Sequence, residues 1–337
     1  MQLPEPLKAY AKQLGFPNSE RLGKLLLDLF DTDQKLRIAG ELPGTIVEIA
    51  DKTGLDEETA RQAILELQSR GAVNERMLEP GRYRLFPAII EIRDAAALTP
   101  GISAENVRLW DDLIRKEFHT LVPRLEKLQL PPLMRVIPIE ETVASAGAVL
   151  DIDSAREIIK GADQVVAIPC VCRQTGREVG RGKNCTAPDD VNLCLMVNGF
   201  GFEAVQRGIG EIISRDEALR RLELAEEAGL VHLTRNNVKK DMMICNSCAC
   251  CCTGLFMLNE IGYSSFAPSR FRVVLNEDDC TACETCVDRC QFHAMTVDDV
   301  ARIDLEKCFG CGVCVTTCPG DALSLEEFRS REHIRVT

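Results

Sequence analysis

Residues 280–290 read CTACETCVDRC, and residues 308–319 read CFGCGVCVTTCP. Both stretches space their cysteines as C-x2-C-x2-C-x3-C. This spacing lets a tight loop direct three thiolates at one metal group while the fourth thiolate leaves for another. The two runs therefore predict a pair of metal centres that exchange ligands.

The two runs resemble the two-cluster bacterial ferredoxin family over about residues 271–327, where residues 294–297 and 322–325 follow them like matching short strands. In that family the fourth cysteine of each run ligates the cluster of the other run. The resemblance implies two [4Fe-4S] clusters, one held by Cys280, Cys283, Cys286 and Cys318, and the other by Cys290, Cys308, Cys311 and Cys314. Zinc also binds paired C-x2-C ligands, but two complete runs favour iron–sulfur.

The runs differ in the residue that follows their last cysteine. Cys318 precedes Pro319, whereas Cys290 precedes Gln291, so we expect a different turn after Cys290. His293 could donate a hydrogen bond to a sulfur of that cluster, and the alternative is an ordinary exposed histidine.

Nine further cysteines lie in the middle of the chain: Cys170, Cys172, Cys185 and Cys194, then Cys245, Cys248, Cys250, Cys251 and Cys252. Four thiolates suffice for one cubane and five for another with one to spare. Since adjacent cysteines rarely all face one metal, we expect Cys251 or Cys252 to be the spare. A larger or non-cubane cluster that draws ligands from both groups is an alternative. We expect one or two further [4Fe-4S] clusters here, with structural zinc or free thiols as the other interpretations.

The elements around these cysteines predict an α/β domain. Residues 135–139 and 164–168 read as strands, and Ser154-x-x-Glu157 reads as a capping box that begins a helix ending at Gly161. A second box at Ser214 begins a helix followed by a strand at 230–234. In α/β units functional groups gather at the carboxyl ends of strands, which favours ligation by the cysteines after residue 168.

A basic loop lies within the first group of middle cysteines. It carries Arg173, Arg177, Arg181 and Lys183 against one acidic residue, Glu178. Such a loop could offset the charge of a cluster, or contact an anion or a partner carboxylate. The alternative is a solvated loop.

The N-terminal region is helical over residues 5–39, with an interruption near 31–33. Residues 44–86, with two short helices and a Pro80-Gly81 turn between extended segments, resemble a winged helix-turn-helix module. Its second helix offers Arg61 and Arg70 but also three glutamates. Because this face lacks a basic stripe, we expect protein–protein docking rather than nucleic-acid binding.

The whole chain is predicted to be a multidomain α+β protein. We expect a helical and winged-helix-like module at 1–88, a helical connector at 89–133, an α/β cysteine-rich domain at 134–268, and a ferredoxin-like domain with a tail at 269–337. Trp110, in the connector, is expected to be a core residue.

Composition sets the expected compartment. Seventeen cysteines in a 337-residue chain without an export signal predict metal-bound thiolates in a reducing cytoplasm. No apolar run reaches the ~20 residues needed to span a bilayer, and the net charge of −12 argues against a general nucleic-acid binder. We expect an anaerobic source, because exposed clusters are lost to oxygen.

These features predict an iron–sulfur electron-transfer protein or redox-complex subunit that works with a redox partner protein. No catalytic residue, Rossmann fingerprint or P-loop stands out. The alternatives are an oxidoreductase that reduces a substrate at an iron–sulfur site in the middle domain, and a cluster-sensing DNA-binding regulator.

Overall fold

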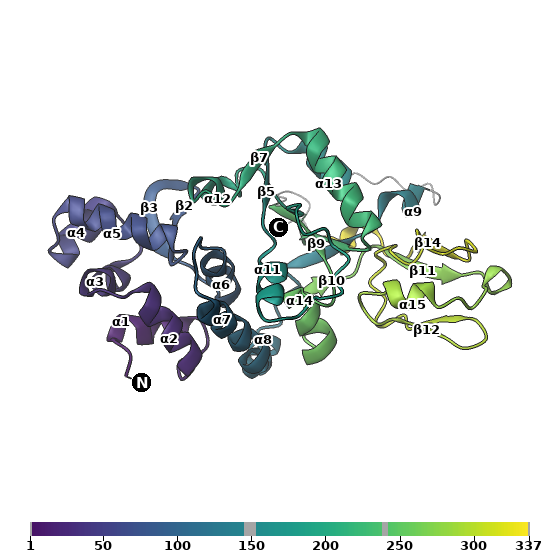
Figure 1. Ribbon diagram of the computed structural model, residues 1–337, viewed down its shortest axis with the longest axis horizontal. Coiled ribbons are helices and arrows are strands. Elements are labelled where there is room, and N and C mark those ends of the chain that lie inside the picture. The colour runs from purple at the N-terminus through teal and green to yellow at the C-terminus, as the bar shows by residue number, and fades with distance from the viewer. Residues whose placement is uncertain (1, 145–152, 238–241, 336–337) are drawn as a thin grey trace. The chain divides into compact units, whose positions relative to one another are not determined.

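The computed structural model describes residues 2–144, 153–237 and 242–335, and the chain forms two compact units (Figure 1). The first unit contains Met1–Leu128, Gln174–Arg181 and Glu203–Ile209. The second contains Gln129–Arg173, Gly182–Phe202 and Gly210–Thr337. No helix in the described ranges is both long and apolar enough to cross a membrane.

The first unit is mainly helical. Its helices are α1 Glu5–Gln13, α2 Glu20–Leu29, α3 Asp33–Glu41, α4 Ile46–Thr53, α5 Glu57–Ser69, α6 Ile89–Ala97, α7 Ala104–Glu117 and α8 Val122–Lys127, with a 3-10 turn at Phe118–Thr120. The strands β1 Gly44–Thr45, β2 Val73–Arg76 and β3 Glu79–Leu85 form one antiparallel sheet in the order β1-β3-β2. As predicted, Trp110 on α7 is buried in the core, with 1% of its surface exposed.

Local sequence explains the helix boundaries in residues 44–70. Thr45 and Glu48 form a reciprocal capping box at the start of α4. Gly54 ends that helix in a left-handed conformation, with φ of 68°, and Asp56 caps the start of α5. The helices α4 and α5 are thereby joined by a tight turn.

The second unit is built on a seven-stranded sheet with the order β10-β4-β8-β9-β6-β5-β7. Its strands are β4 Met134–Ile137, β5 Val165–Ile168, β6 Cys194–Val197, β7 Glu211–Ile213, β8 Val231–Arg235, β9 Met243–Ser247 and β10 Phe266–Ala267. The helices after residue 139 are α9 Glu140–Ala144, α10 Ala155–Gly161, α11 Val171–Glu178, α12 Phe202–Gln206, α13 Arg215–Glu227 and α14 Thr253–Phe256, followed by a π-helical turn at Met257–Ile261. Of these, α11 from Gln174 on and α12 from Glu203 on belong to the first unit.

The predicted helix starts in this unit are confirmed. The hydroxyls of Ser154 and Ser214 each accept a hydrogen bond from the backbone N–H three residues on, at 3.0 and 3.1 Å. Helices α10 and α13 pack their apolar residues against β5 and β6, where Ile159, Val165 and Leu222 are fully or almost fully buried.

The strand directions differ from those expected of an α/β domain. All neighbouring strands in the seven-stranded sheet pair antiparallel except β10 and β4. Alternating strand and helix patterns do not determine how the next strand runs, because a connection can return to either end of the sheet. The cysteines after β5 therefore lie beside the start of β6, and not at a common carboxyl edge.

The C-terminal part of the second unit is a small two-fold arrangement. Strand β11 Phe271–Leu275 pairs antiparallel with β14 Leu323–Glu327, and β12 Met295–Val297 pairs with β13 Ala301–Ile303. Helix α15 Thr285–Arg289 and 3-10 turns at Glu277–Asp279 and Arg331–His333 complete it. The segments predicted as matching strands after each cysteine run thus form β12 and β14.

A buried ion pair connects this C-terminal part to the segment just before α10. The Arg270 guanidinium donates from Nε to the Asp153 carboxylate at 2.6 Å and from Nη1 to Glu327 at 2.6 Å. Asp153 is almost completely buried, so loss of Arg270 would leave its charge without this partner. The backbone N–H of Ile139 also donates to the carbonyl of Cys311 at 3.0 Å.

Candidate metal centres

The C-terminal cysteines line two small cavities, each with four cysteines in its wall. The first is lined by Cys280, Cys283, Cys286 and Cys318, and the second by Cys290, Cys308, Cys311 and Cys314. These are the two predicted ligand sets, each with its fourth cysteine from the other run. The donor chemistry and the matching four-cysteine linings fit two copies of one thiolate-ligated group.

Backbone conformation in the two runs follows the same two-fold pattern. Left-handed φ angles occur at equal offsets from the first cysteine of each run: at Ala282, Glu284 and His293 in the first, and at Gly310, Gly312 and Asp321 in the second. At the first two positions the second run has Gly310 and Gly312, whereas the first run has Ala282 and Glu284. The first run therefore holds two residues with a Cβ in a conformation that is less favourable for them than for glycine. Strain of this kind is typical of loops that direct backbone groups at a ligand.

Backbone N–H groups are directed at the cysteine sulfurs. The N–H of Ala294 donates to Sγ of Cys290 at 3.2 Å, and that of Ala301 donates to Sγ of Cys280 at 3.3 Å. The His293 side chain is exposed, which is the alternative considered for it, and the sulfur of Cys290 accepts from the backbone of Ala294. Burial raises the pKa of Cys311 to about 12, so this thiol needs a positive partner such as a metal to ionise near neutral pH.

Gln291, which replaces the proline seen after the other run, reaches out of the C-terminal part. Its Oε1 accepts a hydrogen bond from the N–H of Ala249 at 2.7 Å, and its Nε2 donates to the carbonyl of Gly229 at 3.1 Å. Ala249 lies between Cys248 and Cys250. A side chain next to one set of thiols is thus hydrogen-bonded to the turn that carries another set.

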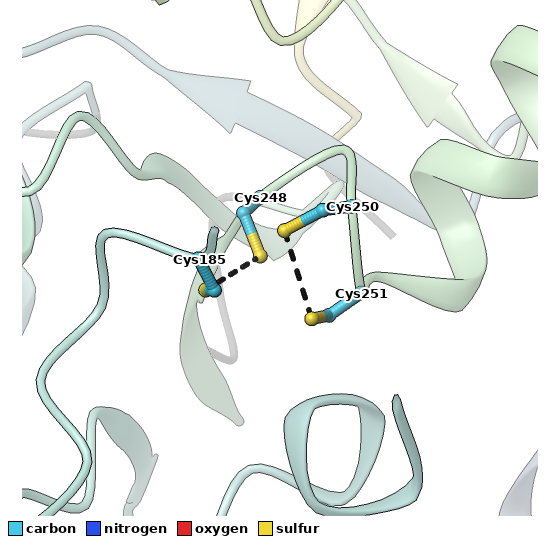
Figure 2. Close-up of side chains that lie close together, drawn as sticks. All are labelled: Cys185, Cys248, Cys250 and Cys251. Carbon is cyan, nitrogen blue, oxygen red and sulfur yellow. Dashed lines mark hydrogen bonds between the residues drawn. The ribbon is translucent and has the colours of Figure 1, made fainter. Parts of the chain in front are cut away.

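Four of the middle cysteines come together in the second unit (Figure 2). Their Sγ atoms all lie within 4.8 Å of one another, with 3.6 Å from Cys185 to Cys248 and 3.6 Å from Cys250 to Cys251. Cys185 comes from the loop after α11, and the other three come from the turn after β9. We call these residues the four-thiol set. Hydrogen bonds from the other three thiols lower the pKa of Cys185 far below its usual range.

Gly182 provides the space that this set needs. Its φ of 66° is left-handed, and a Cβ there would lie 2.5 Å from Sγ of Cys251. The glycine is therefore required by both backbone and packing.

The remaining middle cysteines form a second group, which we call the five-thiol set: Cys170, Cys172, Cys194, Cys245 and Cys252. Strand pairing places them together, because Ile168 is opposite Cys194 across β5 and β6, and Leu195 is opposite Ile244 across β6 and β9. The pKa values of Cys170, Cys245 and Cys252 are raised well above normal by hydrogen bonds to Cys172 or Cys194 and by burial.

The spatial grouping therefore mixes the two groups seen in the sequence. Cys185 lies in the four-thiol set, although the cysteines nearest to it in the sequence do not. Cys245 and Cys252 lie beside Cys194 and Cys172, although they are distant from them in the sequence. Cys251 lies in the four-thiol set and Cys252 in the five-thiol set, and the expectation that one of the two is a spare thiol stays a prediction. All seventeen cysteines fall into these four sets.

Arg173 lies near both middle sets. Its side chain is buried, with 4% of the residue exposed, and it donates to the carbonyl of Asn246 at 2.8 Å. Burial opposes the guanidinium charge, but the neighbouring cysteines, two from each middle set, outweigh this effect and raise its pKa. Arg173 was predicted to lie in a loop, but it lies on α11 Val171–Glu178 and is buried. No local signal in the sequence distinguishes it from the other arginines.

The rest of the basic loop is partly paired within the first unit. Arg181 binds the carboxylate of Asp111 through two nitrogens, with Nη2 at 2.6 Å from Oδ1. Lys183, in the second unit, is exposed. Contact of Arg177 or Lys183 with an anion or partner stays a prediction.

The family comparison bears on the C-terminal thiols. Residues 273–296 and 301–324 each match the 4Fe-4S binding domain. This confirms the two-cluster ferredoxin-like region at the C-terminus and the presence of iron–sulfur sites there. Searches of curated proteins and of solved structures give no match.

Proposed function

We propose that the protein is an iron–sulfur electron-transfer protein or redox-complex subunit, in which electrons pass between the ferredoxin-type clusters and a cluster held by the five-thiol set. Each [4Fe-4S] cluster supplies a site that gains or loses one electron. The proposal rests on an apolar core that contacts both groups of thiols.

That core contains Cys252 and, at its edge, Cys245 from the five-thiol set. Cys290, Cys308 and Cys311 of the second ferredoxin set pack against the same core. Phe309 follows Cys308 directly, and Phe292 lies two residues after Cys290. Their rings stack, with the ring centroids 4.6 Å apart and 11° between the ring planes. A dense apolar contact of this kind fixes the spacing of the two sites and excludes water between them.

The opposite end of the ferredoxin region is open to solvent. Cys283 is exposed, whereas Cys286 and Cys314 are buried. A hydrogen bond with Thr285 lowers the pKa of Cys283. We propose that a one-electron redox partner protein docks at the Cys283 edge, and that the five-thiol set lies further along the route.

The test uses protein purified without oxygen. A reduced ferredoxin or a reduced viologen is added as the electron donor. We expect it to reduce both the C-terminal ferredoxin-type clusters and the five-thiol cluster, and electron paramagnetic resonance detects the reduced clusters. The Cys194→Ser variant should lose about four irons, as one cubane requires, and keep the two ferredoxin signals. Failure of all donors to reduce the protein, or about eight irons per chain in the wild type, as two cubanes alone would give, would contradict the proposal.

A second proposal concerns residues 1–88, which we propose form a winged-helix-like module used for protein docking. Support comes from the order α3, β1, α4, α5, β2, β3 and from the exposed apolar side chains of Leu65 and Leu78. Arg70, one of the two arginines that this helix region offers, binds Asp28 and Asp31 at 2.9 and 3.0 Å. We expect no retention on duplex DNA at low salt; retention that is lost in Arg61→Ala would favour the regulator instead.

A further inference from the structure

We infer that the four-thiol set, Cys185, Cys248, Cys250 and Cys251, binds one tetrahedral metal ion, zinc or ferrous iron, and not a [4Fe-4S] cluster. The inference deepens the proposed function and rests on it for the iron–sulfur nature of the other three sets. It assigns a different kind of site to the turn that follows β9.

The spacing of the sulfur atoms carries the inference. A tetrahedral ion with metal–sulfur bonds of 2.3 Å holds its sulfurs about 3.8 Å apart. The observed Sγ separations are 3.6 Å for Cys185 and Cys248 and 3.6 Å for Cys250 and Cys251, and all four atoms lie within 4.8 Å. A cubane binds each thiolate at a different iron, which places the sulfurs further apart.

The same chain contains an internal comparison. Among the residues that the structure describes, no other three metal-ligating side chains come within 4.8 Å of one another. The eight ferredoxin cysteines, which match the 4Fe-4S binding domain, instead surround cavities. The five-thiol set also lacks the close spacing, so the four-thiol set differs from every other group of thiols in the chain.

Packing leaves little space for a larger group. The position that a Cβ of Gly182 would occupy is 2.5 Å from Sγ of Cys251, so the backbone of the loop is directly against the thiols. Three of the ligands come from residues 248–251, and the fourth comes from 63 residues away. A single ion would therefore join the turn after β9 to the loop after α11.

The charge balance suits a divalent ion. Four thiolates around a doubly charged ion leave a net charge of −2, and the buried guanidinium of Arg173, whose pKa is raised partly by Cys185 and Cys248, offsets part of it. Soft thiolates in a closed tetrahedral site select zinc or iron among the common divalent metals.

The site has a structural consequence for the ferredoxin region. Ala249, in the middle of the ligand turn, donates its N–H to Gln291, the residue after Cys290. An ion at this turn would fix the position of that N–H. We infer that the ion orders the contact between the turn and the Cys290 loop while electrons pass through the five-thiol set.

Metal analysis and X-ray absorption on the intact wild-type protein, purified directly without oxygen, provide the first test. We expect about one zinc per chain with four sulfur neighbours at about 2.3 Å and no metal–metal distance, together with about twelve irons from three cubanes. A chain with no zinc but with a mononuclear iron signal beside the three cubanes would support the same site with ferrous iron. About sixteen irons and neither of these would overturn the inference.

Matched variants separate this inference from the proposed function. Cys185→Ser should lose the single ion and keep all cubane iron, whereas Cys194→Ser should lose about four irons and keep the ion. Loss of about four irons from Cys185→Ser would overturn the inference without affecting the relay. Failure of the donors to reduce a protein with the expected metals would contradict the relay and leave the single-ion site standing.

Discussion

The side-chain oxygen of Gln291 accepts a hydrogen bond from the backbone N–H of Ala249 at 2.7 Å, which connects the loop after Cys290 to the turn that carries Cys248 and Cys250. At the equivalent place in the second run, Pro319 has no side-chain amide to make such a bond. The departure from the ferredoxin pattern that the sequence shows is thus one of the points where the ferredoxin region contacts the middle of the chain.

Replacing Gln291 should weaken this connection. In Gln291→Ala the N–H of Ala249 and the carbonyl of Gly229 lose their partners, each of which is expected to cost about 1 kcal/mol. We expect unchanged metal content but faster loss of iron on exposure to a chelator, measured by the decay of visible absorbance. The exposed neighbour provides the control: His293→Asn keeps a residue that tolerates left-handed backbone and should behave as wild type. Equal decay rates for the two variants would show that the hydrogen bonds of Gln291 do not slow the loss of iron.

The C-terminal ligand sets could be predicted because their geometry is local. The spacing of Cys280, Cys283 and Cys286 fixes a tight loop, and the exchange of Cys290 and Cys318 was predicted from the resemblance to two-cluster ferredoxins. Helix starts at Ser154 and Ser214 were predictable for the same reason, since a cap depends on residues three positions apart.

The middle sets could not be predicted, because their geometry depends on strand pairing. Nothing near Cys185 indicates that its partner is Cys248, 63 residues away. Cys194 meets Cys245 only because β6 and β9 pair antiparallel, and the alternation of strands and helices does not determine that direction. The burial of Arg173 likewise follows from the position of α11, which local sequence does not specify.

Arg173 is expected to raise the reduction potential of the five-thiol cluster. Reduction adds negative charge, which a buried cation stabilises, so Arg173→Gln should lower the midpoint potential by tens of millivolts, on the order expected for changes around a cluster. Arg173→Lys keeps the charge and should recover part of the shift. Lys183→Gln removes an exposed charge from the same segment and should change the potential much less, because solvent screens it. Redox titration followed by electron paramagnetic resonance measures all three, and equal shifts for Arg173→Gln and Lys183→Gln would contradict the role assigned to burial.

Glu203 is expected to make the stability of the protein depend on pH. Burial raises the pKa of Glu203 to about 7, although Arg207 and Arg84 act in the opposite direction. Between its ordinary pKa and about 7 the folded protein binds more protons than the unfolded chain, so the free energy of unfolding falls as pH rises through this window.

The variant Glu203→Gln cannot ionise and should lose this dependence. We expect it to be more stable than wild type at about pH 8, by a few kcal/mol, and to differ much less at about pH 5. Thermal unfolding followed by circular dichroism at both values tests this. A difference between variant and wild type that is the same at both pH values would show that Glu203 does not titrate in this range.

Two neighbouring glycines allow a test of the space around the four-thiol set. Gly180 and Gly182 both have left-handed φ angles, of 79° and 66°, so alanine strains the backbone at either position. A Cβ at Gly180 meets no atom within 4 Å, whereas one at Gly182 would lie 2.5 Å from Sγ of Cys251. We therefore expect Gly182→Ala to displace that ligand and lose the metal of this set, while Gly180→Ala keeps it. The measurement is zinc and iron per chain for both variants. If both variants keep their metal, the Cys251 thiol has room to move away from the added Cβ. If both lose it, backbone strain and not the contact with sulfur is the cause.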